Sequence, residues 1–385
     1  MKSRTMLLLG CLLVLCPRAR SQRLVYSLTY VDTPASRRAR FANVSPVPGF
    51  RSKQQELALE RITWKTDIYS VSVASGKRVQ LFSDEHSNLE LKGGGVVSPA
   101  GKAYMAGTWR EWMAKPYPGF QSEQGVYEIS LDGSGHVHRV LGLRQNQSTT
   151  LMSPQSNKAA LEIFTGREWR IFIYSVPQWQ LLDEWSLSPL IKSHCPDCDP
   201  LSYGWLADGE RIYVELGLVG EESADHPNVG NTTYILSQTG ANLGPVPPVA
   251  SALDLPGYVP LPGTGPECVG HLPDGSWVCE EFAGPKGGPF SNSKPYLVIF
   301  NPRSKSRKQF PLKSNIGLAV ISPTGRYLSF VREHVAPDYR SEEQLWVMDL
   351  ESGAEKEIYS TSPTQGPTST EPNVSLRLLG WLDRN

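Results

Sequence analysis

The sequence predicts an all-β protein, a six-bladed β-propeller whose blades are four-stranded antiparallel sheets. Three observations lead to this prediction: a short glycine turn recurs, an alternating strand pattern recurs after it, and the two ends of the chain carry complementary parts of one repeat. Self-similarity at a period of roughly 40 to 60 residues is typical of repeat architectures. We therefore expect one domain over residues 22–385.

The first repeated feature is a turn that leads into an alternating apolar stretch. Its clearest copy is Ser322-Pro323-Thr324-Gly325, followed by residues 326–330. The other copies lie at 98–101, 153–157, 206–209 and 272–275. Glycine is favoured in such turns because it accepts positive φ at no steric cost.

The second feature is an alternating stretch that ends at another Gly or Ser turn. Its copies are 67–73, 126–131, 170–176, 233–236, 296–300 and 345–350. Alternation with aromatic and β-branched residues predicts strands, and the Gly turn predicts a hairpin into a further strand. Each unit therefore has four strands, which we label a to d from the inside of the ring outward.

The termini complete each other. Residues 380–385 match 204–209, the start of a repeat, whereas residues 23–28 read as the second strand of a repeat without a first. A lone four-stranded sheet cannot bury both faces, but six stacked radially can. We expect residues 376–385 to pair with 23–30 and close the ring. A β-sandwich of irregular repeats is the alternative, and it leaves the complementary ends unexplained.

The segment Ser322–Phe330 followed by Leu345–Leu350 resembles the WD-like propeller repeat of the TolB family, which also occurs in prolyl oligopeptidases. The copy at 322–359 is close, whereas those at 98–141 and 272–312 are weaker. The resemblance implies a propeller fold only. TolB has an additional N-terminal α/β domain and prolyl oligopeptidases have a Gly-x-Ser-x-Gly elbow, and neither is expected here.

The charge balance limits the classes of partner. Lys plus Arg and Asp plus Glu each number 38, so the net charge is zero. That argues against nucleic acid and against anionic membrane surfaces as partners.

The N-terminus predicts export. Lys2 and Arg4 precede an apolar segment from Met6 to Cys16, and small residues at 19 and 21 suit a signal-peptide cleavage site. We expect residues 1–21 to be a signal peptide, no membrane span, and a periplasmic or secreted protein. A lipoprotein anchored at Cys11 is the minor alternative.

The spacing between repeats predicts a binding face. The a–b and c–d turns are tight, whereas long b–c loops are expected at 31–64, 107–124, 217–231, 283–294 and 332–343. Long d–a loops are expected at 187–203 and 247–266. In an antiparallel meander these b–c and d–a connections emerge on one side of the ring, which we call the loop face; the opposite side is the turn face. Insertions gathered on one side of a repeat scaffold usually mark a binding surface, although neutral drift of loop length is the alternative.

Aromatic and arginine side chains are expected to carry binding on the loop face. These types anchor interfaces and sugar or peptide ligands. The candidates are Trp109, Arg110, Trp112, Tyr117 and Phe120 in one loop and Arg332, His334, Tyr339 and Arg340 in another. The alternative for Trp109 and Trp112 is that they fold back over neighbouring blades.

Four cysteines follow the expected signal peptide. Cys268 and Cys279 flank a tight turn in a register suited to a cross-strand disulfide, and Cys195 and Cys198 can close a small loop. Two disulfides are the favoured interpretation. A zinc site that uses all four thiolates, a redox pair and free thiols remain open.

The sequence shows no recognisable catalytic set. His271 is a candidate channel residue on an inner strand. Glu280 and Glu281 are adjacent on one strand, so their side chains are expected to point to opposite faces of the sheet and do not form a catalytic pair. We therefore expect a non-enzymatic protein, with no cofactor or metal, that binds a protein, peptide or glycan. A hydrolase or lyase at the mouth of the channel is the alternative, because propeller enzymes assemble their sites from scattered blades.

Overall fold

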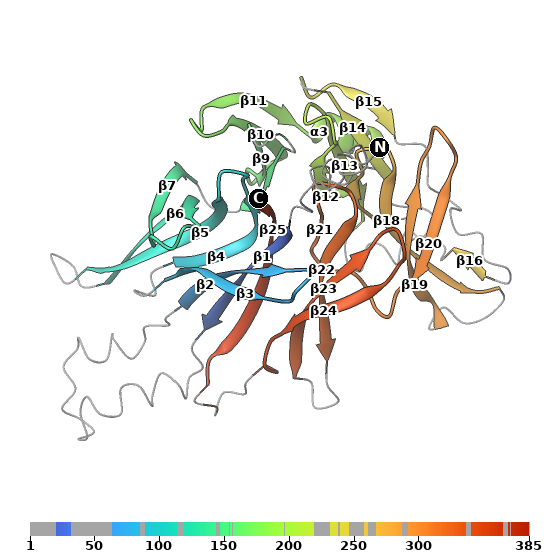
Figure 1. Ribbon diagram of the computed structural model, residues 1–385. Coiled ribbons are helices and arrows are strands. Elements are labelled where there is room, and N and C mark those ends of the chain that lie inside the picture. Colours follow the sequence, from blue (N-terminus) through green and yellow to red (C-terminus); the bar gives the residue numbers. More distant parts are fainter. Residues whose placement is uncertain are drawn as a thin grey trace, which may run out of the picture.

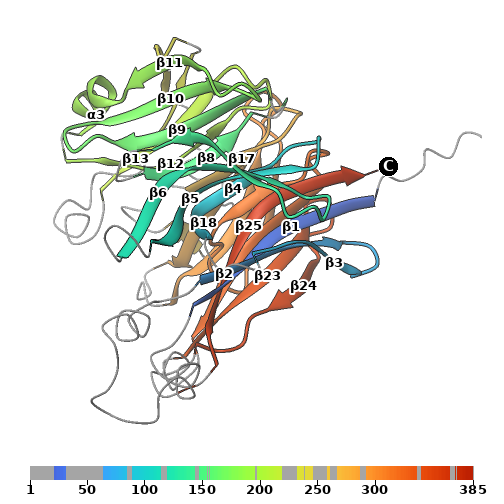
Figure 2. The same ribbon diagram turned by 90° about the vertical axis from the view of Figure 1, so that its left-hand side faces the viewer.

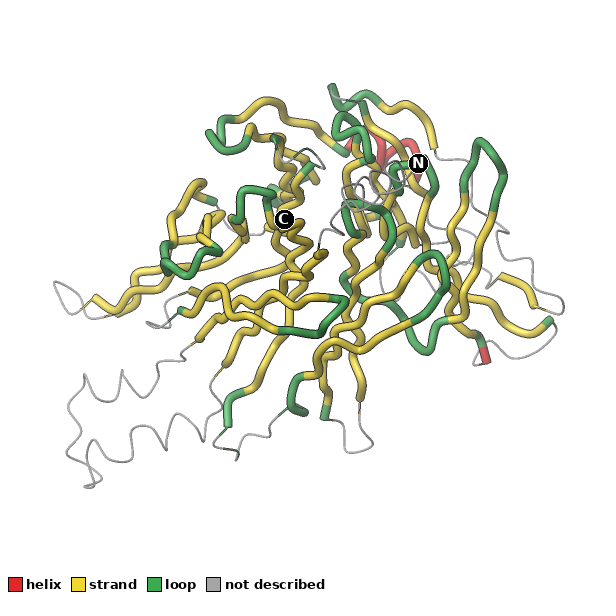
Figure 3. The backbone as a smooth tube through the Cα atoms, viewed as in Figure 1, coloured by secondary structure: helices red, strands yellow, loops and turns green. Residues whose placement is uncertain are grey.

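The computed structural model describes residues 21–31, 64–84, 89–113, 119–143, 147–218 (except 154, 156 and 196), 232–245 (except 238), 258–260, 267–286, 292–335, 340–364, 369 and 371–384. Over these residues the chain forms six antiparallel sheets and one short α-helix (Figures 1 and 3). The predicted all-β class is confirmed.

In the first three blades the strands follow one another from the inside of the ring outward. Blade 1 contains β25 (Asn373–Arg384), β1 (Ser21–Val31), β2 (Trp64–Ser72) and β3 (Arg78–Ser83). Blade 2 contains β4 (Leu89–Val97), β5 (Lys102–Met113), β6 (Gly119–Ser130) and β7 (Val137–Gly142). Blade 3 contains β8 (Gln147–Met152), β9 (Lys158–Phe164), β10 (Trp169–Ser175) and β11 (Leu181–Ser186).

The other three blades continue in chain order. The helix α3 (Ser188–His194) precedes blade 4, which contains β12 (Asp199–Trp205), β13 (Ile212–Gly217), β14 (Thr232–Leu236) and β15 (Asn242–Pro245). Blade 5 contains β16 (Tyr258–Pro260) and β17 (Glu267–His271), both paired with β18 (Trp277–Pro285), then β19 (Lys294–Phe300) and β20 (Arg307–Pro311). Blade 6 contains β21 (Ala319–Ile321), β22 (Tyr327–Val335), β23 (Ser341–Asp349) and β24 (Glu355–Ser360).

The inner strands close a ring. Contacts between them run from β25 to β4, β8, β12, β17 and β21, and then back to β25. The buried apolar residues form six clusters, and each spans one junction between neighbouring blades. One of them joins Tyr26 of blade 1 to Leu345 of blade 6. Burial between all six pairs of blades means that no blade face is left uncovered by a neighbour.

The two ends of the described chain share blade 1, as predicted. β25 pairs antiparallel with β1, with Leu24 opposite Trp381, and the two strands lie side by side in Figures 1 and 2. The indole of Trp381 donates a hydrogen bond to the carbonyl of Val320 in blade 6, at 3.2 Å. The indole of Trp205 in blade 4 makes the same bond to the carbonyl of Leu151 in blade 3, at 3.3 Å. The closing junction therefore repeats the contact between blades 3 and 4.

The recurring glycine turns connect strands a and b. In four of them the glycine N–H donates to the carbonyl three residues earlier, at 2.8 to 3.0 Å. Their glycines are Gly101, Gly209, Gly275 and Gly325, with φ between +65° and +88°. Only glycine adopts this backbone region without strain, which explains why these positions define the repeat.

Candidate functional site

The loop face is built partly from strands that run beyond their blades. β5 and β6 pair as far as Met113 opposite Gly119, so most of the loop expected at 107–124 is an extended hairpin. β22 and β23 likewise pair as far as Val335 opposite Ser341. The prediction of long loops at 107–124 and 332–343 is therefore corrected to extended hairpins. A hairpin can lengthen without any change of its alternating pattern, so loop and strand are hard to separate in the sequence. The d–a connection expected at 187–203 contains α3, and β12 begins within it.

Four of the five binding candidates predicted in blade 2 lie on the strands β5 and β6. Trp109 lies on β5, is partly buried, and packs against the apolar cluster between blades 1 and 2. This position matches the alternative in which the Trp109 side chain folds back toward a neighbouring blade. The strands also include Arg110, Trp112 and Phe120, whereas Tyr117 falls outside the described residues.

The candidates of blade 6 divide into buried and exposed residues. Arg332 is 4% exposed and forms a paired ion contact with Glu355, at 2.7 and 3.0 Å, so it is part of the blade interior. Its expected place in a loop is corrected: it lies on β22. His334 and Arg340 are exposed at the end of the hairpin, and Tyr339 falls outside the described residues. Blade 1 separates these residues from those of blade 2.

An aromatic pair on the loop face was missed by the sequence interpretation. Phe164 and Trp169 flank the short β9–β10 turn of blade 3, with ring centroids 5.1 Å apart. The Trp169 indole donates to Asp199 at the start of β12, at 2.9 Å. Because this b–c turn is the short one, loop length gave no signal for it.

His271 and Glu281 do not form a joint site. His271 lies opposite Trp277 at the end of β17, and its ring meets the Trp277 ring edge-on at 5.0 Å. Glu281 is four residues further along β18, a distance of about 13 Å along a strand. Burial lowers the pKa of His271, and its neighbours are Asp208 and Arg211 of the turn face. The two groups are therefore too far apart for hydrogen bonding.

Buried glutamates recur in three consecutive blades. Glu162, Glu215 and Glu280 are each 7% exposed or less, and each lies three residues beyond the b-strand residue that pairs with the last residue of strand a. Ser202 donates to Glu215 at 2.8 Å, and the Ile316 N–H donates to Glu280 at 3.2 Å. Their burial places these carboxylates in the interior of the propeller, where they contribute to its packing.

Burial shifts the acid strength of two neighbouring glutamates in blade 5. Desolvation raises the pKa of Glu280 to about 7, while the Ile316 N–H opposes the shift. Desolvation also raises the pKa of Glu281 to about 7, against the opposing charge of Arg307. Both groups therefore bind a proton more tightly in the folded protein than in the unfolded chain, where the pKa is about 4.3.

Replacing Glu280 by Gln is expected to stabilise the protein at pH 8. The wild-type folded state loses stability as pH rises from about 4.5 to 7, because its ionised carboxylate is buried. Removing that charge should raise the free energy of unfolding by about 1 to 3 kcal/mol at pH 8 and by less than about 1 kcal/mol at pH 5. Urea unfolding at both pH values measures this. Glu333→Gln, at an exposed position, is the control, and an equal gain at pH 5 and pH 8 would contradict the explanation.

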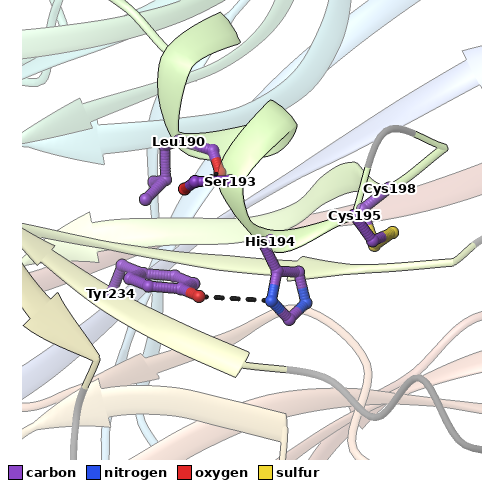
Figure 4. The surroundings of a disulfide bond; sticks show 6 residues. All are labelled: Leu190, Ser193, His194, Cys195, Cys198 and Tyr234. Atoms are coloured by element: carbon purple, nitrogen blue, oxygen red, sulfur yellow. Dashed lines mark hydrogen bonds between the residues drawn. A yellow bond between two sulfur atoms is a disulfide. The ribbon is translucent and has the colours of Figure 1, made fainter.

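The four cysteines form two disulfides. Cys268 and Cys279 lie directly opposite each other on β17 and β18 and are bonded. Cys195 and Cys198 are bonded where α3 leads to β12. Figure 4 shows this second bond beside His194, whose Nδ1 is 3.2 Å from the hydroxyl of Tyr234. The favoured interpretation is confirmed, and these bonds occupy all four sulfurs that the zinc alternative requires.

Mass spectrometry of non-reduced peptides is expected to recover both pairs. Replacing Cys268 by Ala and Cys279 by Val should lower the free energy of unfolding by about 2 to 3 kcal/mol, since the bond restricts the unfolded chain. Urea unfolding measures the loss, and wild type under reducing conditions is the matched comparison. Labelling of four free thiols in the denatured, non-reduced protein would contradict the pairing.

Several solved propeller structures are similar to this chain at low sequence identity. TolB from Acinetobacter baumannii is similar at 11% identity and a TM-score of 0.48, over 92% of this chain and 66% of TolB. A putative TolB from Agrobacterium tumefaciens is similar at 12% identity and a TM-score of 0.43, over 92% of this chain and 99% of that one. An oligogalacturonate lyase from Vibrio parahaemolyticus is similar at 10% identity and a TM-score of 0.43, over 79% and 75% of the two chains. The propeller fold that the resemblance to TolB-like repeats implies is confirmed by the six blades and the closed ring of the structure itself.

The other comparisons add no family. No protein-family model and no curated protein matches the sequence. This chain spans just under two thirds of the Acinetobacter TolB, at 66% of its length. Within the described residues, no helix is long and apolar enough to cross a membrane.

Proposed function

We propose that this chain is an exported, non-enzymatic binding propeller that holds a protein, peptide or glycan on its loop face. The observation that carries the proposal is the difference between the two faces. The turn face repeats one glycine turn with the same hydrogen bond in four blades. The loop face carries the extended β5–β6 and β22–β23 hairpins and α3. Variation placed on one side of a regular scaffold is the usual form of a binding surface.

The exposed side chains of the loop face suit this role. His334 and Arg340 stand at the end of the β22–β23 hairpin beside Val335, which is 55% exposed. Phe164 and Trp169 add a partly exposed aromatic pair on blade 3. Aromatic and arginine side chains next to exposed apolar surface are the groups that anchor partners. Arg332 is not among them, because its charge is already paired inside the blade.

The enzyme alternative lacks a comparable observation. Among the described residues, His271 and Glu281 lie too far apart along one strand pair to act together as acid and base. The glutamates Glu162, Glu215 and Glu280 are at most 7% exposed, so they offer little surface to a substrate. A binding role therefore fits the described residues better than catalysis at the channel mouth.

A capture experiment with matched variants tests the binding role. A loop-face variant carries His334→Ala, Val335→Ser and Arg340→Ala, and a turn-face variant carries Lys77→Ala, His138→Ala and Glu351→Ala, all at exposed positions. Each immobilised protein is incubated with the extracellular or envelope fraction of the source organism. We expect the loop-face variant to lose captured components at least tenfold and the turn-face variant to keep them. Equal capture by both variants would overturn the proposal.

Export is proposed from the expected signal peptide and supported by the two disulfides, which persist in oxidising compartments. Residues 1–20 fall outside the described residues. N-terminal sequencing of the protein from the exported fraction is expected to begin at Gln22. A start at Met1 would contradict cleavage, and a start at Cys11 with an attached lipid would establish the lipoprotein alternative.

A further inference from the structure

A cleft of about 660 Å³ opens between blades 1 and 2. This volume is within the range of small-molecule sites. Its walls are the end of blade 1, over residues 80–84, Trp109 of β5, and the β6–β7 turn with Val137, over residues 133–137. Its described lining comes from blades 1 and 2 alone, so the cleft is separate from the exposed residues of blade 6 on the loop face.

Trp109 provides a fixed aromatic wall. Its ring stacks on the buried Tyr127, with centroids 6.4 Å apart and planes 28° apart. The backbone N–H of Trp109 donates to the Tyr127 hydroxyl at 3.2 Å, and this hydroxyl donates to the Glu123 carbonyl at 2.7 Å, so both ends of the Tyr127 side chain are fixed. The indole packs on this fixed ring and on the apolar cluster between blades 1 and 2, which restricts its motion and lowers the entropy cost of ligand binding.

The polar groups of the cleft are mostly uncharged. Gln80, Ser83, Ser134 and His136 line it, and the described part of its lining contains no lysine or arginine. Asp84 is the one carboxylate among the described lining residues, and one of its oxygens accepts the Leu89 N–H at 2.9 Å. Such a lining offers no counter-charge to a phosphate, sulfate or carboxylate. It suits a neutral ligand that has several hydroxyl groups.

An aromatic wall opposite hydroxyl and amide groups matches the chemistry of a sugar. A pyranose ring has an apolar face of C–H groups, which is attracted to the negative face of an indole, and a rim of hydroxyls that exchange hydrogen bonds. We propose that the cleft between blades 1 and 2 binds a neutral saccharide of one or two residues, with a sugar ring against Trp109 and its hydroxyls toward Gln80, Ser83 and Ser134. This site goes beyond the proposed function of the loop face and does not depend on it.

A printed array of neutral mono- and oligosaccharides, followed by calorimetric titration with the strongest-binding member, tests the proposal. Ser134→Trp places a bulky side chain in the cleft, and Ser304→Trp is the matched control, because Ser304 is an exposed residue in the equivalent turn of blade 5. We expect Ser134→Trp to weaken binding at least about tenfold and Ser304→Trp to change it less than about twofold, as filling a pocket removes most of its contacts. Trp109→Phe, which keeps an aromatic wall, should retain more affinity than Trp109→Ala.

The outcomes separate this proposal from that of the loop face. The variant with His334→Ala, Val335→Ser and Arg340→Ala should bind the saccharide like wild type. The proposal is overturned if no array member binds the wild-type protein, or if Ser134→Trp binds the selected saccharide as well as Ser304→Trp does. A saccharide that is lost with the loop-face variant and kept with Ser134→Trp would place sugar binding on the loop face instead.

Discussion

A chain that ends at residue 372 is expected to lose its cooperative fold in water. The deletion removes β25, which supplies the inner strand of blade 1 and pairs with β1 from Asn373 to Arg384. It also removes the buried side chains Leu376, Leu378, Leu379, Trp381 and Leu382. The loss of several fully buried apolar residues, at about 2 to 3 kcal/mol each, exceeds the net stability of most domains. Circular dichroism melting and size-exclusion chromatography measure the result.

Adding the missing strand back separately distinguishes ring closure from damage to the chain. A synthetic peptide of residues 369–385, mixed with the truncated chain during refolding, should restore the cooperative melt. The same peptide with Leu378→Asp should not, since a charge would then be buried at the junction of blades 1 and 6. A truncated chain with the urea midpoint of the full-length protein would show that the ring is not closed by this strand.

Replacing Arg332 by Ala is expected to cost about 3 to 5 kcal/mol, because the carboxylate of Glu355 is then buried without its partner. The two side chains are 4% and 9% exposed. The Arg332 guanidinium also lies 4.8 Å from the Phe330 ring centroid and 4.9 Å from that of Trp346, contacts that the substitution removes as well. Urea unfolding at pH 7 measures the change.

A second ion pair in blade 6 provides the control. Arg326 and Asp349 are joined at 3.1 Å, but the arginine is 57% exposed. Removal of an exposed pair is worth about 0 to 1 kcal/mol, so Arg326→Ala should have a small effect. The double substitution Arg332→Met with Glu355→Leu should recover most of the stability that Arg332→Ala loses, because no charge is left unpaired. Equal losses for Arg332→Ala and Arg326→Ala would contradict the assignment of Arg332 to the blade interior.

The ring could be predicted from the sequence because each repeat is marked by short sequence patterns. The glycine of the a–b turn needs positive φ, and this requirement marks the same place in blades 2, 4, 5 and 6. The match between residues 380–385 and 204–209 has a physical basis, since Trp381 and Trp205 donate the same hydrogen bond to the preceding blade. Such signals lie within a few residues and survive in a single sequence.

The candidate sites were harder to predict because they depend on contacts between blades. Arg332 looks like a loop residue until Glu355, 23 positions later, is seen beside it. Glu162, Glu215 and Glu280 resemble solvent-facing strand residues, because charged groups are rarely buried. Trp109 stands in a cleft whose other wall comes from residues 80–84 of the preceding blade. Alternation along one strand does not reveal which neighbour covers it.

Photocrosslinking from the two faces of the ring tests the central claim most directly. A photoreactive amino acid is placed at His334 on the loop face or at His138 on the turn face, both of which are exposed. Each protein is irradiated in the intact source organism, and crosslinked species are identified by mass spectrometry. We expect one discrete partner from position 334 and none from position 138. Crosslinks from position 138 alone, or the same set from both positions, would contradict a binding function carried by the loop face.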